Sequence, residues 1–291
     1  MKLLRIAGAL LFLLSTIAFT GFKFYVANNL DLAGPIISCP NSITTSVGAT
    51  EEELLRGVTA YDQQEGDVTK SIIIEEISKF TAASKRIITY AAFDSNNNIA
   101  KKECELIYSD YSPPRFTLSK PLIFNVGEQF DIIQYMKATD CIDGELTDKI
   151  KYDVPSLDFG ESEGSYEVEF RVANSAGDTA ALPVSVEFRY PNNGDDEKTP
   201  EIILSDYLIY IKTGETCNVK SFLKGVKIGQ ENYILNDSLS SSYQNGFMSI
   251  NRIQVQSKIN NMVPGVYEVK YNMTTDDGYT GTTKLLVVVE E

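Results

Sequence analysis

Three sets of landmarks recur along this chain of 291 residues, and they constrain its fold more than any other feature. Each set begins with a proline, has a glycine 13 or 14 residues later, and closes with a strand of alternating aromatic and β-branched residues. The prolines are Pro35, Pro114 and Pro200, and the glycines are Gly48, Gly127 and Gly214. Internal repeats of this kind indicate architecture before any other pattern does. The chain is therefore predicted to be a tandem array of three units.

The spacing of the landmarks sets the size of each unit. Pro35 and Pro114 are 79 residues apart, and Pro114 and Pro200 are 86 residues apart. These distances exceed solenoid periods and are close to the size of one small β-sandwich, so each repeat is predicted to be a domain. The predicted boundaries are 1–30 for an N-terminal apolar segment, 31–110, 111–190 and 199–291 for the three domains, and 191–198 for a linker.

The linker and the third unit depart from a regular array. Residues 191–198 are polar and rich in turn formers, which predicts that the second and third units move more freely against each other than the first and second units do. The third unit is about 14 residues longer than the other two between its glycine and its closing aromatic strand. We therefore expect an insertion in this unit, at about residues 231–262.

Within each unit, short apolar runs predict strands. The clearest runs are residues 71–74, 86–90, 184–188 and 285–289. They are β-branched or alternate between apolar and polar residues, and turns rich in Gly, Asn, Asp and Pro separate them. One short helical turn is expected at residues 50–56, where Thr50 and Glu53 match a capping box. The predicted fold class is all-β.

An acidic motif occurs at the same place in the first two units. It is Asp-Gln-Gln-Glu-Gly-Asp-Val-Thr at residues 62–69 and Asp-Cys-Ile-Asp-Gly-Glu-Leu-Thr at residues 140–147. The third unit lacks it, because Gln230 falls where the first Asp would be. The motif is the one candidate for site chemistry that the repeats share.

The N-terminus is typical of an export segment. Lys2 and Arg5 precede an uncharged run of 17 residues from Ile6 to Phe22, which Lys23 ends. The positive charges ahead of this run predict that the N-terminus stays in the cytoplasm and that everything after the run lies outside. A poor cleavage site favours an uncleaved membrane anchor at residues 6–22 over a signal peptide. With either alternative, the repeats are expected at the cell surface or in the extracellular space.

Charge and composition exclude several classes of function. The net charge of −14 opposes binding to nucleic acid, because neutralising phosphates requires clustered Lys and Arg. The chain contains no histidine, which removes Ser-His-Asp and Cys-His catalysis and ordinary catalytic zinc sites. The chain is therefore expected not to be an enzyme. A glycosidase-like pair of carboxylates is the remote alternative.

The repeats resemble bacterial surface immunoglobulin-like repeats. The resemblance rests on the opening prolines, on the acidic turns at 62–69 and 140–147, and on the closing strand Tyr166–Val172 with its polar turn at Gly177. It covers residues of about 34 to 291 and is strongest in the second unit. Such repeats occur in bacterial cell-surface proteins and in insecticidal crystal proteins. The resemblance implies three immunoglobulin-like β-sandwich domains in tandem after an N-terminal hydrophobic helix.

The first unit also resembles a hyalin repeat, with Cys39 near its start and Cys104 near its end. That family joins these two positions by a disulfide, and the first and last strands of an immunoglobulin-like sandwich are neighbours, so an exported chain is expected to form the bridge. The bridge should stabilise the unit by roughly 4 kcal/mol. Cys141 and Cys217 would lie far apart in an extended array and are expected to remain free thiols.

The acidic turns leave two interpretations open. In the first, side-chain oxygens converge near the junction of the first two units and hold a Ca²⁺ ion that stiffens the array, as a resemblance to cadherin-like repeats implies. The candidate ligands are Asp62, Glu65, Asp67, Asp110, Asp140, Asp143 and Glu145. In the second, the motif only forms tight turns in which Asp side chains accept hydrogen bonds from local backbone. The turn interpretation is favoured, so no cofactor is required and calcium is the one candidate ion.

The expected function is that of an exported, non-catalytic cell-surface protein that acts as a spacer or in adhesion and protein interaction. The alternative is a module that binds a carbohydrate or a host protein through the insertion of the third unit. Tyr233, Tyr243 and Phe247 are the candidate binding residues of that insertion, because loops on rigid scaffolds carry function. An extra hairpin or a mobile loop is the competing interpretation of the same segment. The expected partners are a membrane, through the N-terminal segment, and a surface glycan or protein.

Overall fold

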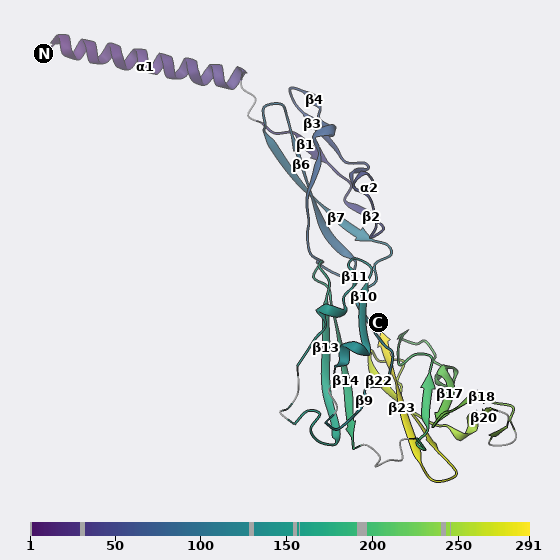
Figure 1. The fold of residues 1–291 in the computed structure, drawn as a ribbon. Coiled ribbons are helices and arrows are strands. Elements are labelled where there is room, and N and C mark those ends of the chain that lie inside the picture. The colour runs from purple at the N-terminus through teal and green to yellow at the C-terminus, as the bar shows by residue number, and fades with distance from the viewer. Residues whose placement is uncertain are drawn as a thin grey trace. The chain divides into compact units, whose positions relative to one another are not determined.

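The structure of the protein is a computed structural model that describes residues 2–29, 33–127, 131–153, 156, 158–190, 197–239, 243–244 and 246–291. Three β-rich repeats follow a single long N-terminal helix (Figure 1). Two sheets make up each repeat, and the strands occupy residues 36–108, 115–189 and 201–290. The fold is all-β apart from the N-terminal helix and short helical turns.

The N-terminal helix α1 (Lys2–Asn29) contains the predicted export segment. Its stretch Ile6–Tyr25 has a mean hydropathy of 1.7, and none of it is buried within the protein. Twenty residues at 1.5 Å per residue span about 30 Å, the thickness of the hydrocarbon core of a bilayer. By length and composition the helix can therefore cross a membrane or act as a signal sequence.

The first repeat is a sandwich of two sheets, β1-β3-β4 and β2-β7-β6-β5. Its elements are β1 (Ile36–Ser38), β2 (Ser42–Thr45), α2 (Glu51–Leu55), β3 (Thr59–Asp62), β4 (Gly66–Asp67), η1 (Thr69–Ser71), β5 (Ile73–Ile77), β6 (Lys85–Phe93) and β7 (Ile99–Tyr108). The fully buried side chains of Ile88, Tyr90 and Leu106 lie at the centre of its core. Ile88 and Tyr90 come from β6, the strand that the aromatic alternation predicts, and Leu106 comes from β7.

The predicted helical turn is confirmed as α2. Thr50 caps it, accepting a hydrogen bond from the backbone N–H of Glu53, while the Glu53 carboxylate accepts one from the backbone N–H of Thr50. Leu54 is the buried residue of the turn, and its carbonyl accepts a hydrogen bond of 2.6 Å from the hydroxyl of Tyr90. The local cap and the core contact together fix this turn over the end of the sandwich.

The second repeat has the same arrangement, in the sheets β11-β10-β8 and β12-β13-β14-β9. Its elements are β8 (Arg115–Leu118), β9 (Ile123–Asn125), η2 (Ile132–Gln134), β10 (Met136–Asp140), β11 (Gly144–Glu145), η3 (Thr147–Lys149), β12 (Lys151–Tyr152), β13 (Gly164–Ala173) and β14 (Thr179–Arg189). Val168, Phe170 and Val172 of β13 are buried while the residues between them are exposed. That alternation is what one buried face of a strand requires.

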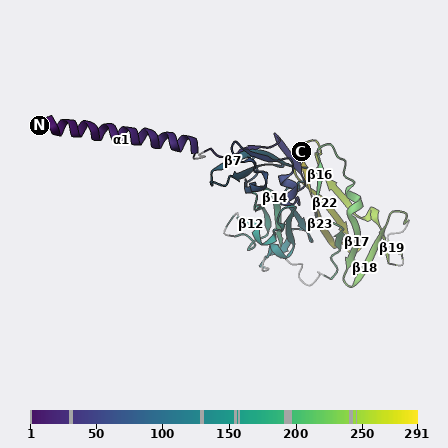
Figure 2. The same ribbon diagram turned by 90° about the horizontal axis from the view of Figure 1, so that it is seen from above.

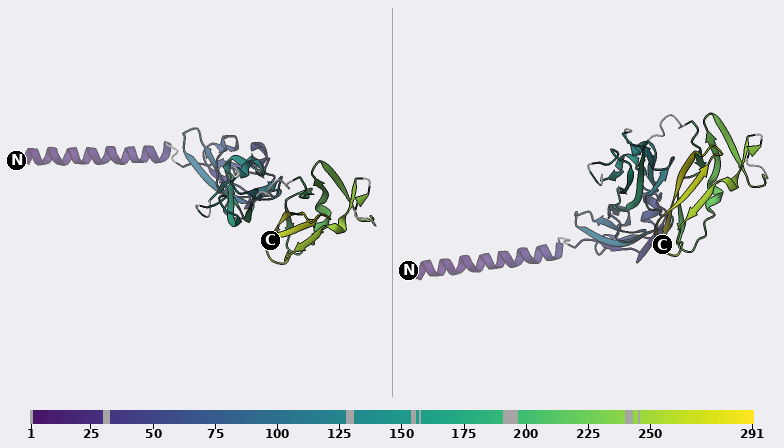
Figure 3. Two further views of the ribbon diagram at one scale, coloured as in Figure 1. Left: turned by 60° about the horizontal axis from the view of Figure 1, so that its bottom comes forward. Right: turned by 90° about the horizontal axis from the view of Figure 1, so that it is seen from below.

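The third repeat consists of the sheets β15-β17-β18-β20-β19 and β16-β23-β22-β21 (Figure 3). Its elements are β15 (Glu201–Leu204), β16 (Leu208–Lys212), η4 (Val219–Phe222), β17 (Leu223–Ile228), β18 (Glu231–Asn236), β19 (Tyr243–Gln244), β20 (Phe247–Ser249), η5 (Ile250–Arg252), β21 (Gln254–Ser257), β22 (Gly265–Thr274) and β23 (Thr280–Glu290). The expected insertion is present as β18, β19 and β20, which widen one sheet. They take the place of the two-residue strand β4 or β11 that follows the acidic turn in the other repeats.

All three repeats share one topological signature. The opening segment of each contributes a strand to both sheets, and its second strand pairs in parallel with the closing strand. The parallel pairs are β2 with β7, β9 with β14 and β16 with β23. This switching of the first strand between two sheets, together with otherwise antiparallel pairing around the closing strand, identifies the repeats as immunoglobulin-like sandwiches.

The expectation that the second and third repeats move more freely against each other than the first and second was wrong. Residues Ser112–Glu291 form one compact unit, and Met1–Tyr111 form another. Leu208 and Leu286 of the third repeat are buried in the hydrophobic core of the second repeat. The hydroxyl of Tyr210 accepts a hydrogen bond of 2.9 Å from the backbone N–H of Phe116. A shared core of this kind overrides the flexible composition of the linker, of which residues 191–196 lie outside the described part of the chain.

The closing strand β23 shows why the two repeats adhere. Leu285, Val287 and Val289 point into the core of the third repeat, whereas Leu286 lies in the core of the second, with the half-buried Val288 packed against it. Figure 2 shows β14 of the second repeat beside β22 and β23 of the third. A strand buried on both faces becomes a continuous apolar run instead of an alternating one.

One buried cation completes this contact. Lys284 is 4% exposed and lies 3.1 Å from the carboxylate of Glu187 in the second repeat and 3.4 Å from that of Glu268 in the third. Burial alone would raise the pKa of Glu187, but hydrogen bonds and charge from Arg189 and Lys284 outweigh it and lower the pKa. The ion pairs offset the free-energy cost of removing the Lys284 ammonium group from water.

Candidate functional site

The acidic motif of the second repeat forms a tight hairpin between β10 and β11. Asp140 pairs with Gly144 across the hairpin, and Gly144 has a φ of +71°, a left-handed conformation that favours glycine. One carboxylate oxygen of Asp140 accepts hydrogen bonds from the backbone N–H groups of Ile142, at 3.1 Å, and Asp143, at 2.7 Å. This is the local turn chemistry that the sequence predicts for Asp.

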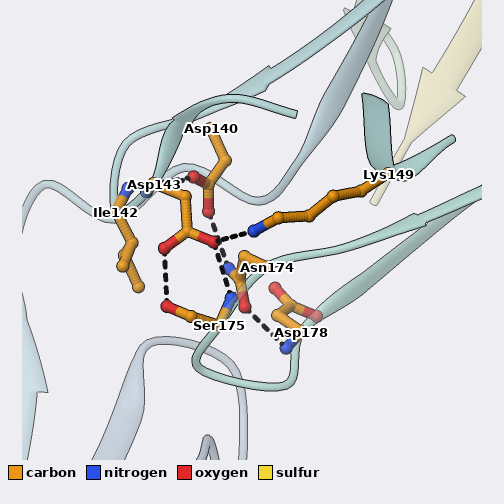
Figure 4. Close-up of polar contacts among 7 residues, drawn as sticks. All are labelled: Asp140, Ile142, Asp143, Lys149, Asn174, Ser175 and Asp178. Atoms are coloured by element: carbon orange, nitrogen blue, oxygen red, sulfur yellow. Dashed lines mark hydrogen bonds and ion pairs between the residues drawn. The ribbon is translucent and has the colours of Figure 1, made fainter. Parts of the chain in front are cut away.

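The same motif also ties two distant turns together (Figure 4). The second oxygen of Asp140 accepts a hydrogen bond of 2.7 Å from the side-chain amide of Asn174, in the turn between β13 and β14. Asp143 accepts hydrogen bonds from the backbone N–H and the hydroxyl of Ser175 in that turn and pairs with Lys149 at 2.9 Å. The spacing of the motif gave no sign of these partners, since they lie more than 30 residues away along the chain.

The first repeat contains most of the same hydrogen bonds around its acidic turn. Asp62 accepts hydrogen bonds through Oδ1 from the backbone N–H groups of Gln64 and Glu65. Glu65 takes the role of Asp143, because its carboxylate accepts hydrogen bonds from the backbone N–H and the hydroxyl of Ser95. The two motifs are therefore equivalent in structure as well as in sequence.

Hydrogen bonds lower the pKa values of several of these carboxylates. For Asp67 and Glu145 the cause is the following threonine, Thr69 or Thr147, which donates through its hydroxyl and its backbone N–H. For Asp143 the causes are Ser175 and then Lys149. These groups are ionised at neutral pH and act as acceptors that fasten the turn.

These contacts bear on the calcium interpretation. In the second repeat, the oxygens of Asp140 and Asp143 already accept from N–H or O–H donors, and the ammonium group of Lys149 lies 2.9 Å from Asp143. Asp110 accepts a hydrogen bond of 2.8 Å from the backbone N–H of Val47 within the first repeat. Across the described residues, no group of three or more Cys, Asp and Glu side chains is arranged to hold a metal ion. The geometry favours the turn interpretation for the second repeat, and calcium binding by these seven residues stays a prediction.

The expected disulfide is present. Cys39, just after β1, is bonded to Cys104 in β7, with a Cα–Cα distance of 6.8 Å. Cys141 and Cys217 are both free, as expected, the first exposed and the second half-buried. The Sγ atom of Cys141 lies 3.2 Å from the backbone nitrogen of Ser112, at the start of its own repeat.

The described residues of the insertion in the third repeat include strands of one sheet, in line with the extra-hairpin interpretation. Tyr233 in β18 is half-buried, packs against the core of the repeat, and donates its hydroxyl to Glu231. Phe247 in β20 is 38% exposed, and its neighbour Met248 is fully buried. Tyr243 belongs to β19, for which the structure describes the backbone alone.

Tyr233 does line a surface cavity. The cavity has a volume of about 270 Å³. Its lining residues are Glu197, Lys198, Ile228, Tyr233, Thr275, Asp276, Asp277 and Tyr279. The ammonium group of Lys198 lies over the ring of Tyr279, 5.2 Å from its centroid. The site combines aromatic rings and carboxylates, and sequence reasoning missed its second half, the turn between β22 and β23.

No family model and no curated protein matches this sequence. Among solved structures, a three-domain structure of Clostridium perfringens ZmpB, holding an M60 catalytic domain with CBM51-1 and CBM51-2, is 12% identical with a TM-score of 0.23. It matches 88% of this chain, which spans 30% of that structure.

Two extracellular cadherin structures are similarly distant. The protocadherin γB4 extracellular domain is 10% identical over 88% of this chain and 49% of its own, with a TM-score of 0.21. Drosophila N-cadherin EC1-4 is 11% identical over 90% of this chain and 76% of its own, with a TM-score of 0.21. At these identities and TM-scores the likeness carries no argument about function, which has to be sought in the chain itself.

Proposed function

We propose that this chain is an exported, non-catalytic protein that holds immunoglobulin-like repeats at the cell surface and acts as a spacer or in adhesion. The observation that carries the proposal is the order of its parts. An apolar helix long enough to span a bilayer is followed by a sandwich closed by a disulfide. Disulfides persist outside the cytoplasm, so the repeats belong on the far side of the membrane from the N-terminus.

The packing between the second and third repeats supports a mechanical role. Their joint is closed by Leu286, by the hydrogen bond from Phe116 to Tyr210, and by the buried Lys284. Buried apolar contact of this kind resists bending, which domains joined by a polar linker alone do not. A spacer or an adhesive platform uses that stiffness to keep an exposed surface in a defined orientation.

Export is tested with the exposed free thiol of Cys141. Intact bacterial cells that produce the full-length chain are treated with a membrane-impermeant maleimide, and the intact mass of the protein is then measured. We expect one label without lysis, none in the matched variant Cys141→Ser, and a mass that still includes residues 6–22. Labelling of Cys141 only after lysis would overturn the proposal, whereas loss of the N-terminal segment would replace the anchor by a secreted form.

The cavity beside Tyr233 favours a second candidate function, binding of a carbohydrate by the third repeat. The half-buried ring of Tyr279, with Lys198 over one face, offers an apolar wall. The exposed carboxylates of Asp277 and of Asp276, which also pairs with Arg252, offer acceptors for hydroxyl groups. Sites for small ligands combine apolar walls with a few polar groups in this way. The candidate differs from the original expectation, because Phe247 does not line this cavity.

Glycan-array binding of the full-length chain in detergent tests this candidate. We expect that Tyr279→Ala and Asp277→Asn each lower the signal for the bound glycan by about tenfold, which corresponds to about 1.4 kcal/mol. Tyr190→Ala, which removes a tyrosine 61% exposed in the second repeat, is the matched control and should leave binding unchanged. An array without signal for the unmodified chain would remove the candidate.

A further inference from the structure

The first repeat contains a buried carboxylate, one oxygen of which accepts no hydrogen bond from the described residues. Asp62 is 1% exposed, and its Oδ1 accepts two backbone hydrogen bonds in the acidic turn. Its Oδ2 is buried and has no hydrogen-bond partner among the described residues. A buried charged oxygen without a donor costs several kcal/mol, so such an atom calls for a compensating group.

The second repeat shows what that group is when the chain supplies it. Asp140 occupies the position of Asp62, and its Oδ2 accepts a hydrogen bond of 2.7 Å from the Nδ2 of Asn174. The other atom of that amide, Oδ1, accepts a hydrogen bond of 2.9 Å from the backbone N–H of Asp178. The side chain of Asn174 thus bridges its own turn and the acidic turn.

Asp94 stands in the first repeat where Asn174 stands in the second. Both close their turns in the same way, because the backbone N–H of each donates to the carbonyl of the fourth residue onward, Asn98 or Asp178. The Oδ1 of Asp94 accepts a hydrogen bond of 2.8 Å from the backbone N–H of Asn98, as the Oδ1 of Asn174 does from Asp178. The equivalence therefore places the Oδ2 of Asp94 where the second repeat has an amide donor.

The first repeat therefore has two buried carboxylates, Asp62 and Asp94, where the second repeat has a carboxylate, Asp140, and an amide, Asn174. Asp94 is 3% exposed, and its Oδ2 accepts a hydrogen bond of 2.7 Å from the Nδ2 of Asn98, which leaves no donor for Asp62. Two carboxylates placed in this way repel each other, and a cation between them removes the repulsion. The two turns have Asp and Asn in exchanged positions, because the first repeat has Asp94 and Asn98 where the second has Asn174 and Asp178. This exchange makes a cation site possible in the first repeat and not in the second.

We propose that the first repeat binds a calcium ion between Asp62 and Asp94. The ion replaces the amide hydrogen that Asn174 supplies in the second repeat. Carboxylate oxygens are the ligands that Ca²⁺ prefers, and water and backbone carbonyls complete its coordination. Gln63, Gln64 and Glu65 of the turn are exposed, so water can reach the site. The site lies inside one repeat, and it does not depend on the proposed function.

Thermal unfolding of the full-length chain in detergent, with 10 mM CaCl₂ or with a chelator, tests the site. An affinity typical of extracellular calcium modules raises the unfolding temperature of the first repeat by roughly 5–10 °C. Asp94→Asn restores the pairing of the second repeat, so it should abolish the calcium response and raise the unfolding temperature in chelator. Tyrosine-sensitised terbium luminescence, with Tyr61 next to the site, should appear with the unmodified chain and disappear in this variant.

Glu103→Gln is the matched control. It removes one exposed negative charge from β7 of the same repeat, and it should leave the calcium response intact. Asp62→Asn provides a second test of the pair, because the new amide can donate to Asp94. An unmodified chain that gains nothing from calcium overturns the proposal.

Discussion

The first and third repeats have the same fold and stabilise it by different means. The first has a disulfide between Cys39 and Cys104, and its closing strand β7 carries exposed charged residues, including Lys101 and Lys102. The third repeat has no disulfide among its described residues, and its closing strand β23 buries both faces. One face of β23 completes its own core and the other enters the core of the second repeat.

The difference shows how a domain of fewer than 100 residues reaches stability. A sandwich of this size buries a smaller fraction of its surface than a larger domain, so a single core leaves it marginal. A covalent link lowers the entropy of the unfolded chain, and a shared core adds buried apolar area. The first repeat is stabilised by its disulfide and the third by its contact with the second repeat. Mutations can therefore test these two means of stabilisation separately.

Removing the disulfide should have the largest effect. Cys39 and Cys104 are 65 residues apart in sequence, and opening a loop of that length costs about 4 kcal/mol. In calorimetry of the full-length chain, Cys39→Ala with Cys104→Ala should lower the transition of residues 1–111 strongly and leave that of residues 112–291 in place. Cys141→Ala, which removes a free thiol, is the control. Equal loss in both transitions would show that the two units do not unfold independently.

The second-largest loss of stability should come from truncating a side chain in the core that the second and third repeats share. Leu286→Ala removes a side chain that is 4% exposed and lies in the core of the second repeat, which should cost about 2–5 kcal/mol. The variant should also separate the joint transition of residues 112–291 into two. Leu285→Ala makes the same change on the opposite face of β23, inside the third repeat, and should lower stability without separating the transitions. If both variants behave alike, the second and third repeats are not coupled through β23.

The sequence predicted those parts of the fold that depend on short-range patterns. The three repeats and the capping box of Thr50 follow from spacing and local chemistry. The pairing of Cys39 with Cys104 follows from the resemblance to a hyalin repeat and from the neighbouring first and last strands of a sandwich. The shared core was missed although its signal was present. Residues 285–289 are five apolar residues in a row, where Tyr267–Tyr271 alternates, and an unbroken run indicates a strand covered on both sides. The polar linker indicated movement between the second and third repeats, and the prediction followed the linker instead of the apolar run.

The candidate site was less accessible to sequence reasoning. The acidic motif indicated a turn, and it is one. Its partners Asn174, Ser175 and Ser95 lie on other turns, which no periodicity connects to the motif. The shortage of donors at Asp62 becomes visible only when the closing turn is placed against it. The course of β18 to β20 was also unpredictable, because residues 231–249 carry no repeat landmark.

The buried tyrosines test a feature that the first and third repeats share and the second lacks. Tyr90 donates a hydrogen bond of 2.6 Å to the carbonyl of Leu54, and Tyr271 donates one of 2.7 Å to that of Val219. Burial raises the pKa of Tyr90 to about 12. The equivalent residue of the second repeat is Phe170.

Each of Tyr90→Phe and Tyr271→Phe leaves a carbonyl without its donor, so each should cost about 1–3 kcal/mol of unfolding free energy. Chemical denaturation of the full-length chain measures that loss. Tyr166→Phe, which removes a half-buried hydroxyl with longer hydrogen bonds of 3.0 to 3.4 Å, is the control and should cost less. A cost from Tyr166→Phe as large as from the other two would mean that burial does not set the strength of these bonds.

The smallest effect should come from the titration of Glu187, at the contact between the second and third repeats. The ordinary pKa of Glu187 is 4.5, and its partners Arg189 and Lys284 lower it in the folded protein. A carboxyl with a lowered pKa binds fewer protons in the folded state than in the unfolded state, so its contribution is complete above pH 4.5 and is lost as the pH falls through the folded pKa. The unfolding temperature of residues 112–291 in the unmodified chain should therefore exceed that of Glu187→Gln by a constant amount between pH 6 and 8, and the gap should close below pH 4.5. Protonation leaves the buried Lys284 with Glu268 alone, which weakens the contact that replaces a disulfide in the third repeat. A gap that does not change down to pH 3 would show that the charge of Glu187 contributes nothing and that apolar contact alone holds the two repeats together.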